Sequence, residues 1–258
     1  MLAARGRRLT RSKRARGALR SLLVLLCSAW SSACTVHVFS PVNLPPLESS
    51  ATLGEGRYSV QGEAYVGGAI WGPKISSYRA VVARGITPKL DVSLAPSLLL
   101  IHAREPGNPR GNVYSLRAGV KYAPERWLAF SAGLAPGSSV GGSYLAEDFG
   151  FTMGGENRYL VPFFSARGVL SVPLRARTVR IMYDDWDDSP EEESQAYFRK
   201  PLFTSGWQIV QGLKLPLTHD AAAKVRPSLV CAVSFTGLYT RRASDLFGMF
   251  GCAAEATF

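Results

Sequence analysis

The sequence predicts an all-β protein, a closed antiparallel up-and-down barrel of about ten strands that crosses a membrane. Three observations support this fold class. From residue 57 onward, apolar residues occupy alternate positions in one short stretch after another. Short and long connections between these stretches alternate along the chain. The charged residues within the stretches fall mainly on the face opposite the apolar rows. A chain of 258 residues can form such a barrel as a single domain.

The alternation is clearest between residues 113 and 123. One face holds Tyr114, Leu116 and Val120, and the other holds Arg117 and Lys121. Only a β-strand separates two such sets, because side chains of a strand point alternately to opposite faces. Ten stretches of this kind predict ten strands, at residues 58–66, 78–86, 90–100, 113–123, 128–134, 160–170, 179–183, 207–215, 229–235 and 250–258.

The connections distinguish a transmembrane barrel from a soluble sandwich. Short turns are expected near residues 87–88, 123–126, 172–175 and 219–224, whereas residues 67–74, 104–112, 137–158 and 184–205 are expected to form longer loops and 240–244 a short one. Short turns at one rim and long loops at the other are typical of transmembrane β-barrels, and an even strand number places both chain ends at the same rim.

The charged face is expected to line a polar interior. Charges in an apolar core are costly unless they are paired, whereas a barrel lumen can hold them as a hydrated ionic lattice. The residues assigned to this face are Glu63, Arg79, Asp91, Arg117, Lys121, Arg167, Arg180, Lys214, Arg226 and Glu255.

The N-terminus has the order of a secretory signal peptide. Eight basic residues lie within the first 20, followed by an apolar stretch at 21–30 and small residues at 31–33. This stretch is too short for a permanent membrane helix. Without those eight residues the chain has 22 basic and 19 acidic residues, so the net charge of +11 comes mostly from the signal and a nucleic-acid partner is not expected. Residues 1–33 are therefore predicted to be removed.

Cys34 follows Ser31, Ser32 and Ala33 in a pattern that resembles the lipobox of bacterial lipoproteins, which implies lipidation of Cys34. Ser31 departs from that pattern, so cleavage after Ala33 without lipidation is the alternative. Residues 34–56 have three prolines and no periodicity, and we interpret them as a periplasmic linker.

Residues 57–258 resemble a Gram-negative outer-membrane β-barrel protein. The chain ends in alternating residues, Phe250, Cys252, Ala254, Ala256 and Phe258, similar to the C-terminal assembly signal of that class. The resemblance implies a location in the cell outer membrane. It also implies outer-membrane lipid, lipopolysaccharide and the barrel-assembly machinery as partners, and a structural, surface or small-channel role. It does not indicate an oligomeric state.

Two groups of residues are candidate sites. Register across the last hairpin would place Cys231 opposite Cys252, so they could form a disulfide or simply be two small apolar residues. A predicted outer loop contains seven carboxylates that could hold a divalent cation or merely be solvated, namely Asp184, Asp185, Asp187, Asp188, Glu191, Glu192 and Glu193.

No catalytic residue, metal centre or cofactor is predicted. The three histidines, His37, His102 and His219, are too scattered to form a metal cluster. Two alternatives stay open: a lipid-anchored barrel that faces the periplasm and binds an apolar ligand inside, and a lipid-modifying outer-membrane enzyme that uses His102 with a loop serine.

Overall fold

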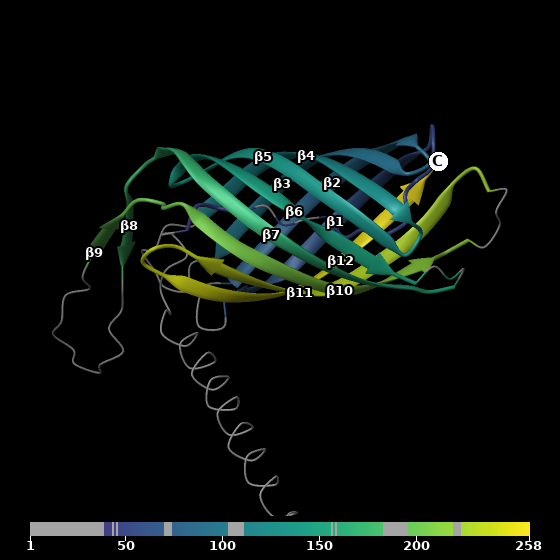
Figure 1. The fold of residues 1–258 in the computed structure, drawn as a ribbon. Coiled ribbons are helices and arrows are strands. Elements are labelled where there is room, and N and C mark those ends of the chain that lie inside the picture. The colour runs from purple at the N-terminus through teal and green to yellow at the C-terminus, as the bar shows by residue number, and fades with distance from the viewer. Residues whose placement is uncertain are drawn as a thin grey trace, which may run out of the picture.

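Ten antiparallel strands close into a β-barrel in the computed structural model, in the order β1-β12-β11-β10-β7-β6-β5-β4-β3-β2 (Figure 1). The structure describes residues 39–42, 44, 46–69, 74–102, 111–155, 157, 159–182, 196–218 and 223–258. The predicted fold class and the number of barrel strands are confirmed. Among the described residues, no helix is long and apolar enough to cross a bilayer.

The barrel strands are between 12 and 16 residues long. They are β1 (Tyr58–Ala69), β2 (Lys74–Thr87), β3 (Leu90–His102), β4 (Gly111–Glu125), β5 (Leu128–Ser139), β6 (Gly142–Gly154), β7 (Val161–Ala176), β10 (Thr204–Pro216), β11 (Arg226–Tyr239) and β12 (Ser244–Thr257). Two further strands, β8 (Val179–Met182) and β9 (Ala196–Arg199), pair only with each other.

The strands are staggered as closure of a barrel requires. Successive register partners lead from Tyr239 on β11 through Ser205, Leu170, Glu147, Leu134, Ala118, Leu94, Val82, Val60 and Ala256 back to β11 at Pro227. One circuit around the barrel thus starts at Tyr239 and ends at Pro227, twelve residues away on the same strand. This offset in register means that the strands are tilted relative to the barrel axis.

The two faces of the sheet have opposite character. Val120 of β4 points outward and is 50% exposed, whereas the next residue, Lys121, points inward and is 9% exposed. The same alternation runs along β1, where Val60 and Val66 are exposed and Glu63 is buried. Apolar side chains therefore cover the outside of the barrel, and polar and charged ones are buried within it, as the period-two pattern predicts.

One barrel strand was assigned to the wrong segment. Residues 137–158, predicted as a loop, contain the end of β5 and all of β6. Of residues 179–183, predicted as a barrel strand, residues 179–182 form β8 outside the barrel sheet. The turn expected at 172–175 lies within β7. The alternation of β6 is obscured by its glycines and by the adjacent acids Glu147 and Asp148, one of which points outward and the other inward.

The two rims differ, and both ends of the barrel sheet lie at one of them. The C-terminal rim holds the start of β1, the end of β12 and the turns at residues 88–89 and 126–127. The opposite rim holds the long connection of residues 177–203 with β8 and β9, so we call it the β8–β9 rim. Figure 1 shows β8 and β9 at the end of the barrel away from the C-terminus.

Residues 39–56, here called the lumenal segment, cross the inside of the barrel. Phe39 forms a bridge with Leu202 at the β8–β9 rim, and Thr52 donates to the carbonyl of Pro88 at the C-terminal rim. Interpretation of this part of the chain as a periplasmic linker is therefore wrong. Its prolines and small polar residues suit an irregular chain whose backbone groups are satisfied by the surrounding wall rather than by water.

The lumenal segment joins β1 through a tight turn at the C-terminal rim. Gly54 and Gly56 both have positive φ, 88° and 74°, a conformation that L-residues with side chains rarely adopt. The amide of Gly56 donates to the carbonyl of Gly85 at 2.9 Å, which fixes the turn against β2. This turn reverses the chain, so the lumenal segment is followed by a strand of the wall that encloses it.

Candidate functional site: the occupied lumen

The lumenal segment fills part of the barrel with apolar side chains. Phe39, Leu44 and Leu47 are buried, at 6% exposure or less. They belong to one cluster with inward-facing residues from six strands, namely Tyr65, Ile75, Phe163, Val169, Val210, Val230, Ala232, Leu238, Phe247, Met249 and Ala253. The predicted polar interior is therefore found only in part, because the wall presents apolar residues where the segment packs against it.

Polar side chains of the wall satisfy the backbone of the segment. The amide of Leu47 donates to Oε1 of Glu63 at 3.0 Å, and its carbonyl accepts from Nε2 of Gln61 at 2.8 Å. Nearer the C-terminal rim, Asp91 accepts from the amide of Leu53 and Lys121 donates to the carbonyl of Ala51 at 2.8 Å. Buried backbone groups need such partners, and the side chains of the wall provide them for this segment.

A continuous ionic network links the segment to four strands. Glu48 accepts from Arg167 at 3.0 Å and lies 3.4 Å from Nζ of Lys121, which in turn lies 3.3 Å from Asp91. On the other side, Arg167 reaches Oδ1 of Asp148 at 3.2 Å. Asp148 also accepts two bonds from Arg117, both at 2.7 Å.

The network is electrically balanced. It contains three carboxylates and three cations, and the side chains of Arg117, Arg167 and Asp148 are each at most 2% exposed. Removing one member would leave an opposite charge buried without its partner, at a cost of several kcal/mol. The arrangement can therefore hold a chain segment in a low-dielectric lumen without an unpaired charge.

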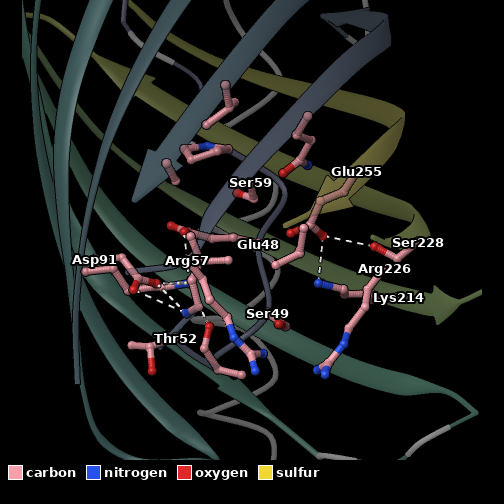
Figure 2. A pocket seen from close by; sticks show the side chains of 18 of the residues that line it. Glu48, Ser49, Thr52, Arg57, Ser59, Asp91, Lys214, Arg226, Ser228 and Glu255 are labelled. Atoms are coloured by element: carbon pink, nitrogen blue, oxygen red, sulfur yellow. Dashed lines mark hydrogen bonds and ion pairs between the residues drawn. The ribbon is translucent and has the colours of Figure 1, made fainter. Parts of the chain in front are cut away.

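A charged vestibule lies between the network and the C-terminal rim. It has a volume of about 500 Å³, and Figure 2 shows Glu48 and Asp91 on one side of it and Lys214 and Glu255 on the other. Lys214 lies 2.6 Å from Oε2 of Glu255, and Ser228 donates to the same oxygen at 3.0 Å. The lumenal segment contributes Pro46, Glu48 and Leu53 to its lining, and Thr257 lines it at the C-terminal rim.

Most charges predicted to face inward do so. Glu63, Arg79, Asp91, Arg117, Lys121 and Arg167 are buried, and Lys214 pairs with Glu255. Arg180 is an exception, because it lies on β8 outside the barrel sheet. Glu48 and Asp148 were not predicted to face the interior, because their segments were interpreted as a linker and a loop. One signal could have revealed them: the ten residues assigned to the interior contain seven bases and only three acids, so carboxylates were missing.

Cys231 and Cys252 are joined by a disulfide between β11 and β12. They are directly opposed in the register and lie on the outward rows, next to Val233 and Phe250. The bond crosses the hairpin that closes against β1. Of the two interpretations that the sequence left open, the structure has the bonded one.

His102 lies at the β8–β9 rim and is exposed, with Nε2 3.0 Å from Oγ of Ser76 on the neighbouring strand. Its serine partner therefore comes from a strand and not from a loop. A nucleophilic serine also requires a group that orients the imidazole. In the described part of the chain, no hydrogen bond or ion pair joins this ring to a carboxylate.

Several predicted sites lie outside the described residues. They are Cys34, His37, His219 and all seven carboxylates of the acidic run from Asp184 to Glu193. Within the described ranges, no cluster of three or more His, Cys, Asp or Glu residues could hold a metal ion.

The ligand-binding alternative required the apolar rows to point inward. The opposite is found, since Val60, Leu94, Phe149 and Phe235 are all exposed on the outside. An apolar exterior around a closed antiparallel sheet, with buried ion pairs within, is the distribution typical of transmembrane β-barrels. That is the class of protein which the fold and the lumen define.

Comparison with solved structures finds distant similarity to other β-barrel proteins. No protein-family model and no curated protein matches the sequence. Among solved structures, the β domain of the Bordetella autotransporter BrkA is 12% identical, with a TM-score of 0.46 over 79% of this chain and 98% of that one. The N-terminal β-barrel domain of Pseudomonas aeruginosa OprF is 14% identical, with a TM-score of 0.33 over 78% and 98%. Neisserial surface protein A is 12% identical, with a TM-score of 0.37 over 79% and 98%. At these identities the likeness concerns the fold alone.

Proposed function

We propose that this protein is an outer-membrane β-barrel with a structural, surface-exposed role, and that its own N-terminal segment closes the lumen. The single observation that carries the proposal is the lumenal segment itself. It is packed against the wall through Phe39, Leu44 and Leu47 and is tied to it by the Glu48 ion pairs. A lumen occupied in this way suits a closed barrel better than an open pore or a carrier of apolar ligands.

The location in the outer membrane is supported by the surface of the barrel. Exposed apolar residues on each of the ten barrel strands suit contact with hydrocarbon, and full closure removes sheet edges that a bilayer could not accommodate. The C-terminal rim, with short turns and both ends of the sheet, then faces the periplasm. The charged vestibule lies toward that rim.

The N-terminal signal completes the proposal. Residues 1–33 serve as the signal peptide and Cys34 is the lipidation site. Outer-membrane lipid, lipopolysaccharide and the barrel-assembly machinery are the partners, and the protein is not an enzyme. Replacement of Cys34 by alanine would test the lipid, since radiolabelled palmitate should be incorporated into the wild type and not into this variant.

Conductance in planar bilayers tests the closed lumen. Wild-type protein that runs as a folded, heat-modifiable band should show no steady conductance. A variant that lacks residues 39–52 and still gives the heat-modifiable band should open, because the segment no longer occupies the lumen. Steady conductance of the wild type would contradict the proposal, and so would a folded deletion variant that stays silent. Recovery of the wild type in a detergent-free supernatant would refute the membrane location.

A further inference from the structure

The lumenal segment runs through the barrel in one defined direction. At the β8–β9 rim, the amide of Ser40 donates to Oγ1 of Thr204 at 2.8 Å. The hydroxyl of Ser40 lies 2.8 Å from Oγ of Ser171. Ser171 also donates to the carbonyl of Pro41 at 2.7 Å. The first described residues of the chain are thus fixed at the rim opposite the C-terminus.

The other end of the segment is fixed equally well at the C-terminal rim. Ser50 donates to the carbonyl of Arg126 at 2.8 Å and Thr52 to that of Pro88 at 2.7 Å, and both carbonyls belong to rim turns. Between the two ends, Glu48 is paired on both sides. The chain therefore enters the barrel at the β8–β9 rim and leaves it at the C-terminal rim.

We infer that the polypeptide preceding Phe39, including Cys34, is displayed on the outer side of the cell. The inference rests on the proposed outer-membrane location, in which the C-terminal rim faces the periplasm and the β8–β9 rim faces outward. The barrel then has a function beyond anchoring itself, because it carries its own N-terminal end across the membrane through the lumen.

The distance along the chain places the lipid on the outer side as well. Cys34 precedes Phe39 by five residues, which span at most about 18 Å when fully extended. The lumen below Phe39 is occupied by the segment and its packed cluster. With Cys34 lipidated as proposed, its acyl chains would enter the outer leaflet, and not the periplasmic leaflet where a linker would have placed them.

Three epitope insertions in the full-length protein test this topology. One tag follows Val36, one follows Asp187 in the connection at the β8–β9 rim, and one follows Pro88 in a turn of the C-terminal rim. We expect antibody to stain the first two on intact cells and the third only after the outer membrane is permeabilised. Each variant is first checked for the heat-modifiable band.

Staining of the Val36 tag only after permeabilisation, with the Asp187 tag accessible on intact cells, overturns the inference and leaves the barrel in place. Staining of the Pro88 tag on intact cells with loss of the other two signals means that the barrel is inverted, which also overturns it. Absence of the untagged protein from the membrane fraction is a different result, because it refutes the proposed function itself.

An engineered disulfide gives a second readout that needs no tag. Ser40→Cys combined with Ser171→Cys should crosslink in the folded protein, since the two hydroxyl oxygens lie 2.8 Å apart. The matched control combines Ser40→Cys with Ser228→Cys, a buried inward position near the C-terminal rim, and should not crosslink. Mass spectrometry of disulfide-linked peptides shows which of the two double variants is crosslinked. A crosslink in the control, or none in the Ser171 variant, overturns the threading.

Discussion

Oε1 of Glu48 lies 3.0 Å from Nη2 of Arg167, although the two residues are 119 positions apart in the chain. Glu48 belongs to the lumenal segment and Arg167 to β7 of the wall. The pair is therefore the point at which the occupant of the barrel is joined electrostatically to the barrel itself. The same carboxylate also faces Lys121 at 3.4 Å, so one side chain of the segment serves two strands.

Replacement of Glu48 by alanine should destabilise the barrel by about 2 kcal/mol, because Arg167 and Lys121 lose a carboxylate within a largely buried network. The free energy of unfolding in detergent, followed by the heat-modifiable band in urea, measures the change. Glu55→Ala is the matched control, since Glu55 is an exposed acid of the same segment and should change the free energy by less than about 0.5 kcal/mol. Equal stability of the two variants would contradict the role given to Glu48.

Asp148→Ala should be more costly, at about 3 to 5 kcal/mol, because it leaves Arg117 and Arg167 buried without their shared carboxylate. The neighbouring Glu147→Ala provides the control on the same strand, since Glu147 points outward and is exposed. The same unfolding measurement applies. If Glu147→Ala lowered the free energy of unfolding more than Asp148→Ala, the opposite face of β6 would point toward the lumen.

Val120→Arg should destabilise the protein in lipid by about 2 kcal/mol, because a cation would replace an apolar side chain on the hydrocarbon-facing surface. Val120→Leu keeps that surface apolar and should have little effect. Reversible unfolding from lipid vesicles measures both. If the arginine variant were as stable as the leucine variant, the outer face of β4 would not be in contact with lipid.

The Cys231–Cys252 disulfide should leave no free thiol at either position in the denatured, unreduced protein, and Cys231→Ser should release one reactive thiol at Cys252. Because the bond closes a loop across a sequence separation of 21, the double replacement by serine should lower the free energy of unfolding by about 3 kcal/mol. Maleimide labelling followed by peptide mapping checks the first result and urea unfolding the second. Labelling of both cysteines without reductant would show that they are unbonded.

His102→Ala should leave the lipid A profile of the cell unchanged, as should Ser76→Ala, because we expect the pair to be a surface hydrogen bond and not a catalytic one. Mass spectrometry of extracted lipid A, compared with cells that lack the protein, is the measurement. A lipid A species that disappears from both variants, and also from the cells without the protein, would identify an enzyme.

The sequence by itself determined the sheet, its two faces and nine of the ten barrel strands. Period-two alternation is a local property, and each residue's side in a strand follows from its neighbours two positions away. That is why Val120 and Lys121 were assigned to the correct faces and why Cys231 was placed opposite Cys252. The alternation failed only where glycines and adjacent acids interrupted it, in β6, and the short row at 179–183 was then taken as the missing strand.

Only the tertiary structure decided what fills the lumen. The lumenal segment has no periodicity, and its backbone bonds are made to side chains such as Glu63 and Asp91, which only the closed barrel brings next to it. The inward position of Glu48 likewise depends on its ion pairs with Arg167 and Lys121, which are far away in sequence. Strand faces can be read from the sequence because they depend on neighbouring residues, whereas the occupant of a closed barrel is decided by contacts between residues that the fold alone brings together.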